Sequence, residues 1–391
     1  MEKLNTLTVY RKLVTDKLIQ DMQDGLNGDE NAVYNVSARL LEIEGGISPS
    51  EYLARRLVLS KNSYTLACEK EQSFPHWEML LRDLKLIQAF IVRALKELPI
   101  SASLLCPATT RYGKVEKELL NGTTESLAQA IREYVAKHGT GVLGSASAFV
   151  YQEKLRPVQN IVQVSLDDLL GFEEEKHILC MNTEAFLEGK KALNALLYGE
   201  RGTGKSSTIK AILNRYKDAG LKMIEVDKEN LKHLKYLLEL LRNRGGKYIL
   251  FLDDLSFENY ENDYKSLKAL MQGELEEKTD NILVYATSNR RHFIREDWSD
   301  RMDEMGEIHK SDSMEEKLSL VDRFGILLTF QRLNKKEYLE MVRFMSSRKG
   351  LTIEDEELIR EALQWEISGH GMSGRSAEQL MISLLMREER A

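Results

Sequence analysis

The chain has 391 residues, of which 42% are apolar, so it can bury the cores of two or three domains and is not a disordered chain. Its net charge of −7 disfavours a nucleic-acid footprint over the whole protein, although this sum would hide a basic patch on one face. Three scattered cysteines and seven scattered histidines indicate neither a disulfide framework nor a transition-metal site. The first residues are charged, and no apolar run reaches the roughly 18 residues of a membrane span, so we expect a cytoplasmic protein with no membrane contact.

The first 138 residues have the apolar spacing of amphipathic helices, and we expect an all-α domain at 1–138. A first helix is predicted where apolar side chains recur every four residues, at Tyr10, Val14, Leu18 and Met22. In SPSEYLARRLVL, Ser48 can cap a helix that has Pro49 in its first turn. The segment HWEMLLRDLKLIQAFIVRALKEL, from His76, predicts a long buried helix, and Gly139 predicts the end of TTESLAQAIREYVAKH. None of these patterns indicates a chemical role.

A change of pattern near residue 165 predicts a second, different domain. Residues 139–164 are rich in Gly, Ser and Ala and then read KLRPVQN, which we interpret as a connection. From 165 to 333, short apolar runs alternate with helical patterns, which predicts an α/β fold with a parallel sheet between helices. The five predicted strands are 193–198, 221–226, 248–253, 282–286 and 326–330. Residues 334–391 return to helical patterns alone and predict a three-helix unit.

A glycine-rich loop follows the first predicted strand and precedes a helical pattern. GERGTGKSS satisfies G-x-x-x-x-G-K-[ST], in which backbone N–H groups surround a polyphosphate at a helix N-terminus. Lys205 would neutralise the β- and γ-phosphates, and Ser206 would ligate Mg²⁺. The residues expected to contact nucleotide are Gly199, Glu200, Arg201, Gly202, Thr203, Gly204, Lys205, Ser206 and Ser207. A glycine-rich turn without a ligand is the alternative interpretation.

Two carboxylates end the apolar run YILFLDD, at the position where a P-loop enzyme keeps the acid that holds its metal. Asp253 would hold Mg²⁺ through water, and Asp254 would polarise the water that attacks the γ-phosphate. The alternative is that two acids merely end a buried strand and begin a solvated loop. The phosphate loop upstream favours the first interpretation.

Further polar residues follow the fourth predicted strand, ILVYATSNRRH. The amide of Asn289 is suited to holding the attacking water or the γ-phosphate, with a turn-forming asparagine as the alternative. Arg290, Arg291 and His292 come next. They would contact a neighbouring subunit or nucleic acid, or simply form a solvated charged loop.

Three arginines in the C-terminal part are candidates for phosphate contacts. Arg323 precedes the fifth predicted strand and Arg301 lies upstream of it, and either guanidinium would stabilise transition-state charge in a neighbouring copy. Arg375 lies in the first turn of the last predicted helix, where the helix dipole disfavours a cation. Contact with a phosphate explains that position, and a plain surface arginine is the alternative.

With these motifs in this order, residues from about 165 to 391 resemble the AAA+ ATPases. SLDDLLGFEEEK is similar to the segment that leads into the nucleotide site of that superfamily, GERGTGKSS to Walker A and YILFLDD to Walker B. Asn289 matches sensor 1, Arg375 matches sensor 2 of a helical lid, and DRFGI is similar to the arginine-finger stretch of the Holliday-junction branch-migration motor. More narrowly, LLYGERGTGKSS, EVDKENL, DDLSFE, YATSNRRH and DRFG resemble a bacterial family of predicted AAA+ ATP-binding proteins of unknown function.

The resemblance implies an AAA+ core at 165–333 with a helical lid at 334–391, ATP and Mg²⁺ as ligands, and a homo-oligomeric ring, with a hexamer as one form. One position departs from the family pattern, because Walker B strands usually end Asp-Glu, whereas Asp254 is one methylene shorter and reaches about 1.5 Å less. From the resemblance as a whole, we expect an ATPase that couples ATP binding and hydrolysis to remodelling of an unidentified protein client. Two alternatives stay open: a slow-hydrolysing assembly switch, and a DNA-remodelling or loading ATPase.

Overall fold

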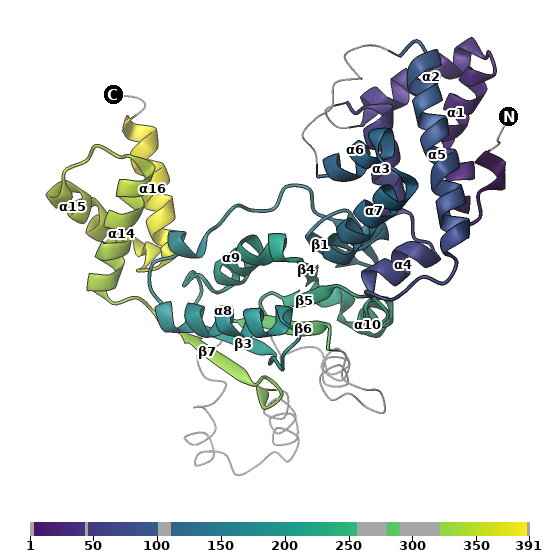
Figure 1. Cartoon of the computed structure of the whole chain (residues 1–391). Coiled ribbons are helices and arrows are strands. Elements are labelled where there is room, and N and C mark those ends of the chain that lie inside the picture. The colour runs from purple at the N-terminus through teal and green to yellow at the C-terminus, as the bar shows by residue number, and fades with distance from the viewer. Residues whose placement is uncertain (1–3, 44–45, 101–110, 256–279, 290–320, 389–391) are drawn as a thin grey trace. The chain divides into compact units, whose positions relative to one another are not determined.

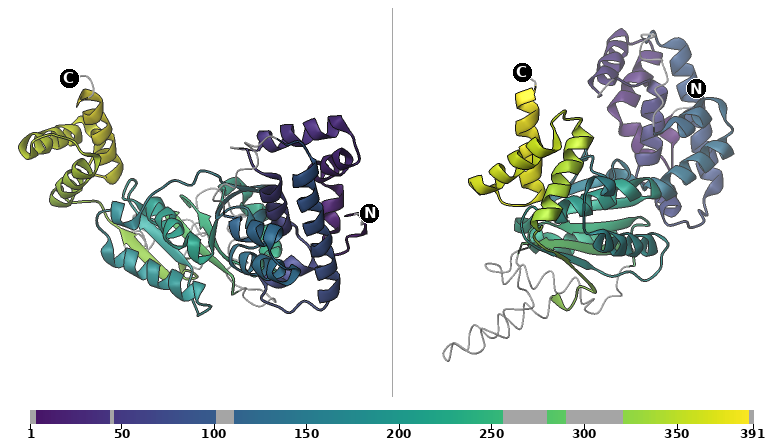
Figure 2. Two further views of the ribbon diagram at one scale, coloured as in Figure 1. Left: turned by 45° about the horizontal axis from the view of Figure 1, so that its top comes forward. Right: turned by 90° about the vertical axis from the view of Figure 1, so that its left-hand side faces the viewer.

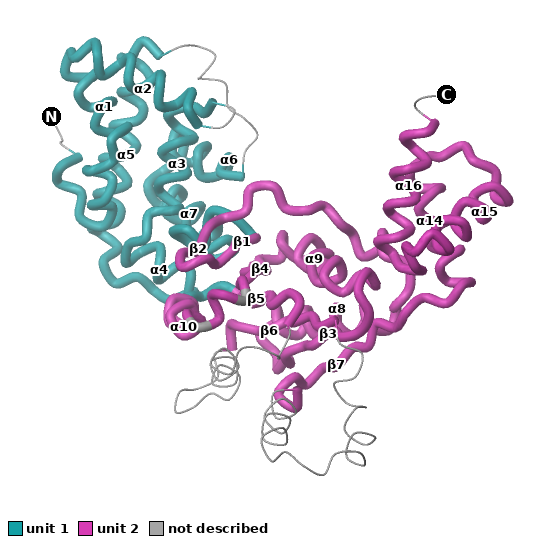
Figure 3. The backbone as a smooth tube through the Cα atoms, turned by 180° about the vertical axis from the view of Figure 1, so that it is seen from behind, with its two compact units in different colours: residues 1–147, 244–246 teal, residues 148–243, 247–391 magenta. Residues whose placement is uncertain are grey.

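A computed structural model of the chain describes residues 4–43, 46–100, 111–255, 280–289 and 321–388 (Figure 1). The chain divides into two compact units, shown in two colours in Figure 3. Unit 1 comprises residues 1–147 and 244–246, and unit 2 comprises residues 148–243 and 247–391. Each unit has its own hydrophobic core, and we describe each by itself.

Unit 1 is helical, as predicted. Its α-helices within the described ranges are α1 (Lys17–Leu26), α2 (Glu30–Glu42), α3 (Pro49–Leu59), α4 (Ser63–Glu69), α5 (Trp77–Glu97), α6 (Gly113–Asn121) and α7 (Thr124–His138). The predicted caps of two of them are confirmed. The Ser48 hydroxyl accepts the N–H of Glu51 at the start of α3, and Gly139 follows α7 with a φ of 75°.

The prediction of one continuous helix from Tyr10 to Met22 is wrong. Residues Arg11–Thr15 form a separate 3₁₀ turn, and α1 begins only at Lys17. The reason is Asp16, whose carboxylate accepts the N–H groups of Leu18 and Ile19 and therefore caps a new helix at this point.

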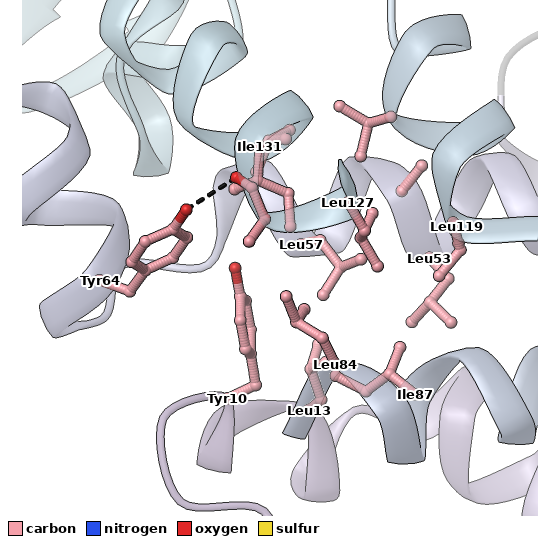
Figure 4. Close-up of a cluster of buried hydrophobic side chains, with 14 of the residues drawn as sticks. Tyr10, Leu13, Leu53, Leu57, Tyr64, Leu84, Ile87, Leu119, Leu127 and Ile131 are labelled. Atoms are coloured by element: carbon pink, nitrogen blue, oxygen red, sulfur yellow. Dashed lines mark hydrogen bonds between the residues drawn. The ribbon is translucent and has the colours of Figure 1, made fainter. Parts of the chain in front are cut away.

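The core of unit 1 forms where helices from distant parts of the sequence meet (Figure 4). Leu57, Leu84 and Ile131, from α3, α5 and α7, are almost completely buried. The Tyr64 hydroxyl in this core donates to the carbonyl of Ala128 at 2.7 Å, so the aromatic ring is buried without leaving its polar atom unpaired. Residues 244–246 belong to this unit, and the Arg244 guanidinium there donates to both oxygens of Glu69 at 2.9 and 2.8 Å.

Unit 2 is built on a sheet whose strands run in the order β2-β1-β4-β5-β6-β3-β7. The five predicted strands are confirmed as β3 (Ala195–Gly199), β4 (Leu221–Val226), β5 (Lys247–Leu252), β6 (Ile282–Ser288) and β7 (Ile326–Phe330), all parallel. Their largely apolar sequences fit strands that are covered on both faces, and every residue of β6 is buried.

Two further strands lie in the segment 139–164 that the sequence analysis interpreted as a connection. β1 (Ala148–Gln152) pairs in parallel with β4, and β2 (Lys154–Pro157) turns back antiparallel beside β1. Both strands were missed because AFVYQ is only a short apolar run, and its partner β2, at the edge of the sheet, is mostly exposed. The sheet of the described residues therefore has seven strands, with the predicted five at its centre and one end.

Within the described ranges, the α-helices of unit 2 are α8 (Glu173–Leu187), α9 (Lys205–Tyr216), α10 (Leu234–Arg242), α14 (Lys335–Lys349), α15 (Asp355–Trp365) and α16 (Gly374–Glu388). Helices α8 and α9 share one apolar cluster with residues of β3, β5 and β6, so they cover the same face of the sheet (Figure 2). Helices α14, α15 and α16 follow β7 and pack around a core of their own, which confirms the predicted three-helix unit. Leu170 and Phe172, which precede α8, pack against this C-terminal core. Within the described ranges, no helix is both long enough and apolar enough to span a membrane.

Candidate functional site

The glycine-rich loop joins β3 to α9, and its shape depends on glycine. Gly199, the last residue of β3, has a φ of 136°, and a Cβ atom there would lie 2.0 Å from the carbonyl oxygen of Phe330 on β7. Gly204 has a φ of 93° and is the N-cap of α9. Both conformations favour glycine, and they bring the loop's backbone to the N-terminus of α9, where anions bind.

Lys205 is the first residue of α9 and is only 5% exposed. Its Nζ donates to the carbonyl of Gly199 at 2.9 Å and to the carbonyl of Glu200. Burial lowers the pKa of Lys205 to about 8, although the nearby carboxylates of Asp253 and Asp254 act in the opposite direction. The ammonium therefore lies in an environment that favours the arrival of negative charge.

A cluster of oxygen atoms faces the loop across the ends of β5 and β6. Oδ1 of Asp253 accepts hydrogen bonds from the hydroxyls of Ser206 and Thr287, both at 2.6 Å. Carboxylate and hydroxyl oxygens are the hard ligands that Mg²⁺ prefers, with the remaining positions filled by water or substrate phosphate. The donor set of Ser206 and Asp253 therefore fits Mg²⁺.

Asp254 has a φ of 55°, in the left-handed region. Its N–H donates to Oγ1 of Thr287 at 2.8 Å, and its carboxylate accepts from the Asn289 amide. Asp and Asn tolerate this region better than longer side chains, so the backbone at this position favours Asp over Glu. The shorter acid noted in the sequence is thus accompanied by a left-handed backbone.

The C-terminal helices complete a cleft of about 520 Å³ around these residues. The N–H of Gly374, at the start of α16, donates to the carbonyl of Gly202 in the phosphate loop at 3.0 Å. Arg375 lies in the first turn of α16, as predicted, and lines the cleft. The volume of the cleft lies within the usual range of a small-molecule site.

Most of the predicted site residues meet in this cleft. Its lining includes Arg201, Gly202, Thr203, Gly204, Lys205, Ser206, Ser207, Asp253, Asp254, Asn289 and Arg375. Gly199 and Glu200 lie beneath it, with their carbonyls bonded to Lys205. Arg301, Arg290, Arg291 and His292 lie outside the described residues.

Arg323 does not reach the cleft. Gly199 pairs with Phe330 and Ala195 with Ile326, so Arg323 lies at the edge where the strands begin, opposite the phosphate loop. Its side chain is exposed. A role for Arg323 at a nucleotide therefore requires the nucleotide of another copy.

Several residues of the cleft were not predicted from the sequence. Thr287 bridges the two acids, and Met341 and Met345 of α14 form an apolar wall together with Leu170. Thr287 and Asn289 lie two residues apart, and the alternation of side chains along a strand would have placed both on the same face. The methionines gave no such signal, because they lie far from the loop in sequence.

β3, the strand that precedes the phosphate loop, lies between β6 and β7. The two acids follow β5, and the three C-terminal helices follow β7. This order and this cleft define a P-loop nucleotide-binding protein of the AAA+ superfamily. Within the superfamily, the chain belongs to the family described as "Protein of unknown function (DUF815)", whose model matches residues 144–388, more than half of the chain. The resemblance noted in the sequence is thereby confirmed.

Comparisons with individual proteins cover shorter stretches. The replication factor C large subunit of Methanococcus vannielii is 36% identical over 78 residues, which are 20% of this chain and 15% of that subunit. The RuvB Holliday junction branch migration motor of Thermotoga maritima matches 56% of this chain and 64% of its own at 19% identity and a TM-score of 0.39. The Aeropyrum pernix ORC1 protein, solved in complex with DNA, matches 57% of this chain and 62% of its own at 17% identity and a TM-score of 0.42. The chain thus spans less than two thirds of each of these proteins.

The low pKa of Lys205 predicts that nucleotide binding takes up a proton at alkaline pH. Without nucleotide, Lys205 loses its proton as the pH rises through about 8, whereas phosphates hold it in the charged form. Affinity for ATP should therefore be nearly constant below pH 7.5 and fall several-fold between pH 8 and 9. Calorimetric titration in two buffers of different ionisation enthalpy at pH 7.5 and 9 measures the uptake. Equal proton uptake at the two pH values would contradict the prediction.

Proposed function

We propose that this protein binds Mg-ATP in the cleft and hydrolyses it to drive a conformational change that remodels a protein client. The observation that carries the proposal is the meeting of a buried lysine with two carboxylates at the phosphate loop. Lysine, carboxylate and a ring of backbone N–H groups together are the parts that phosphoryl transfer requires. The AAA+ fold supports the same class of activity.

In this proposal the loop from Gly199 to Ser207 surrounds the phosphates, and Lys205 gives up its bonds to the loop carbonyls to bind the β- and γ-phosphates. Ser206 and Asp253 would hold Mg²⁺, and the metal would supply positive charge that offsets the charge of the phosphates. The adenine lies against Leu170, Met341 and Met345, and Arg375 contacts a phosphate from the lid.

For hydrolysis, Asp254 orients the attacking water and accepts its proton, and Asn289 holds the water or the γ-phosphate from the other side. Arg323 lies at the other edge of the sheet, so we assign it to the nucleotide of a neighbouring copy in a homo-oligomeric ring. The arginine finger in trans makes turnover depend on assembly.

In the same proposal, each region of the chain has its own role. The nucleotide core comprises residues 165–333 together with β1 and β2, and residues 334–391 form the lid, whose angle to the core changes with the nucleotide. The helical region 1–138 binds the client, and the protein acts in the cytoplasm.

The geometry of Asp254 favours a second candidate function. Oδ1 of its carboxylate already accepts from the Asn289 amide and its backbone is left-handed, so an attacking water would compete with Asn289 for this oxygen. An ATP-dependent assembly switch, in which binding drives oligomerisation and hydrolysis is slow, uses the same residues.

Turnover and assembly measured side by side distinguish the two functions. We expect the wild-type protein to hydrolyse more than about one ATP per minute, and Arg323→Ala to lose at least about tenfold of that rate while keeping its affinity for ATP. Arg360→Ala, which removes an exposed arginine of α15, is the control and should not change the rate. Slower turnover combined with ATP-dependent assembly by light scattering would favour the switch. Addition of DNA at low salt tests the DNA-remodelling alternative, which requires a change in rate.

A further inference from the structure

The chain segment after β5, which carries both carboxylates, is fastened to the end of β6. The N–H of Leu255 donates to the carbonyl of Thr287 at 2.7 Å, and the Ser288 hydroxyl donates to the carbonyl of Leu255 at 2.9 Å. These two bonds hold the backbone just beyond the acids. Two more bonds, both made by the Thr287 side chain, hold the acids themselves.

Thr287 uses its single hydroxyl in both directions. Oγ1 accepts the N–H of Asp254 at 2.8 Å and donates to Oδ1 of Asp253 at 2.6 Å. The backbone N–H of Asp254 can only donate and is taken up by a lone pair of the hydroxyl, so the single hydroxyl proton is left for the Asp253 carboxylate. The side chain is 2% exposed, and water has little access to replace it.

Each of the two hydrogen bonds of the Thr287 hydroxyl holds a different acid. Asp254 has a left-handed backbone, which persists only where the surroundings hold it, and its N–H is directed to Thr287. Asp253 shares Oδ1 between Thr287 and Ser206, and Ser206 is the residue that would turn to Mg²⁺. Thr287 is then the partner that keeps the Asp253 carboxylate in place while Ser206 rotates away.

We propose that Thr287 is the positioning residue for both carboxylates, setting the direction of Asp253 toward the metal and of Asp254 toward the water. This inference rests on the proposed function, because it assigns the two acids to Mg-ATP. Thr287 acts through the acids by the geometry of one hydroxyl, and its side-chain methyl is not needed.

The test compares Thr287→Val with Thr287→Ser in the full chain. Valine has the shape of threonine without the hydroxyl, and serine keeps the hydroxyl without the methyl. Thr183→Val is the matched control, because the Thr183 hydroxyl is also buried, on α8, and bonds the Leu179 carbonyl and the Tyr285 hydroxyl. Turnover at saturating ATP is measured against Mg²⁺ concentration, and ATP affinity is measured with Mg²⁺ and with EDTA.

We expect Thr287→Val to lose about tenfold to 100-fold in turnover, to need several-fold more Mg²⁺ for half-maximal rate, and to keep its affinity for ATP in EDTA. Thr287→Ser should stay within about threefold of wild type, and Thr183→Val within about twofold. Wild-type behaviour of Thr287→Val, or an equal loss in Thr287→Ser or Thr183→Val, would overturn the inference. If the wild-type protein binds ATP without turning it over, hydrolysis in the proposed function fails, and Thr287 is judged by whether valine abolishes the gain in ATP affinity that Mg²⁺ gives.

Discussion

Replacing Lys205 with alanine is expected to lower the affinity for ATP at least about 100-fold and to abolish turnover. Each hydrogen bond to a charged group is worth about 1.5–3 kcal/mol, and the ammonium would make at least two such bonds, to the β- and γ-phosphates. A loss of about 2.7 kcal/mol already corresponds to 100-fold in affinity. Titration with a fluorescent ATP analogue measures the affinity, and phosphate release measures turnover.

Lys205 also bonds the carbonyls of Gly199 and Glu200, so the variant must be shown to keep its fold. The melting temperature without nucleotide serves this purpose. Lys205→Met keeps most of the side-chain volume without the charge, and it provides a second variant in which affinity and turnover are measured. Lys190→Ala removes an exposed lysine in the loop before β3 and should leave binding unchanged. Normal turnover in a folded Lys205→Ala protein would sink the assignment of this loop to nucleotide.

The parts of the fold that the sequence predicted are those whose signals are local. Strands β3 to β7 are short and largely apolar, and polar residues or glycine flank them, so their type and approximate ends could be read directly. The phosphate loop carries its own spacing of glycines, lysine and serine. Asp253 and Asp254 follow a strand whose character is equally plain.

The parts that the sequence did not predict depend on partners that are distant along the chain. β1 pairs with β4, and nothing within AFVYQ names that partner. The hydrogen bond from the Gly374 N–H to the Gly202 carbonyl joins α16 to the phosphate loop. Both of its atoms belong to the backbone, which carries no sequence signal. Asp16 is different, because its capping role is local and could have been read, but the four-residue spacing of apolar side chains outweighed it.

The left-handed backbone of Asp254 could not be predicted either, and it changes how the short acid is interpreted. From the sequence, aspartate in place of glutamate means only a shorter reach. In the structure, the left-handed φ at this position favours aspartate, and hydrogen bonds from Asn289 and to Thr287 hold the residue. Reach and backbone conformation therefore have to be changed separately in any experiment on this acid.

Asp254→Asn is expected to lower turnover at least about 100-fold while ATP affinity stays within about threefold of wild type. Asparagine has the size of aspartate and tolerates the same left-handed backbone, so it removes the proton acceptor and little else. The ATP-bound state should then persist, and a pull-down with the variant held in ATP should retain the client that the wild-type protein releases. Turnover is measured by phosphate release and the assembly state by light scattering.

Asp254→Glu changes both reach and backbone preference, and the rate of hydrolysis and the stability to urea report on the two separately. A longer acid restores the usual reach of an AAA+ site, but glutamate adopts a left-handed backbone less readily than aspartate. We therefore expect Asp254→Glu to be less stable to urea than wild type and no faster in hydrolysis. A faster Asp254→Glu protein would show that reach limits turnover, and would identify the wild-type protein as a slow switch. If Asp254→Asn hydrolyses ATP at the wild-type rate, Asp254 does not act on the water, and the acid that does so must be sought elsewhere in the cleft or in a neighbouring copy.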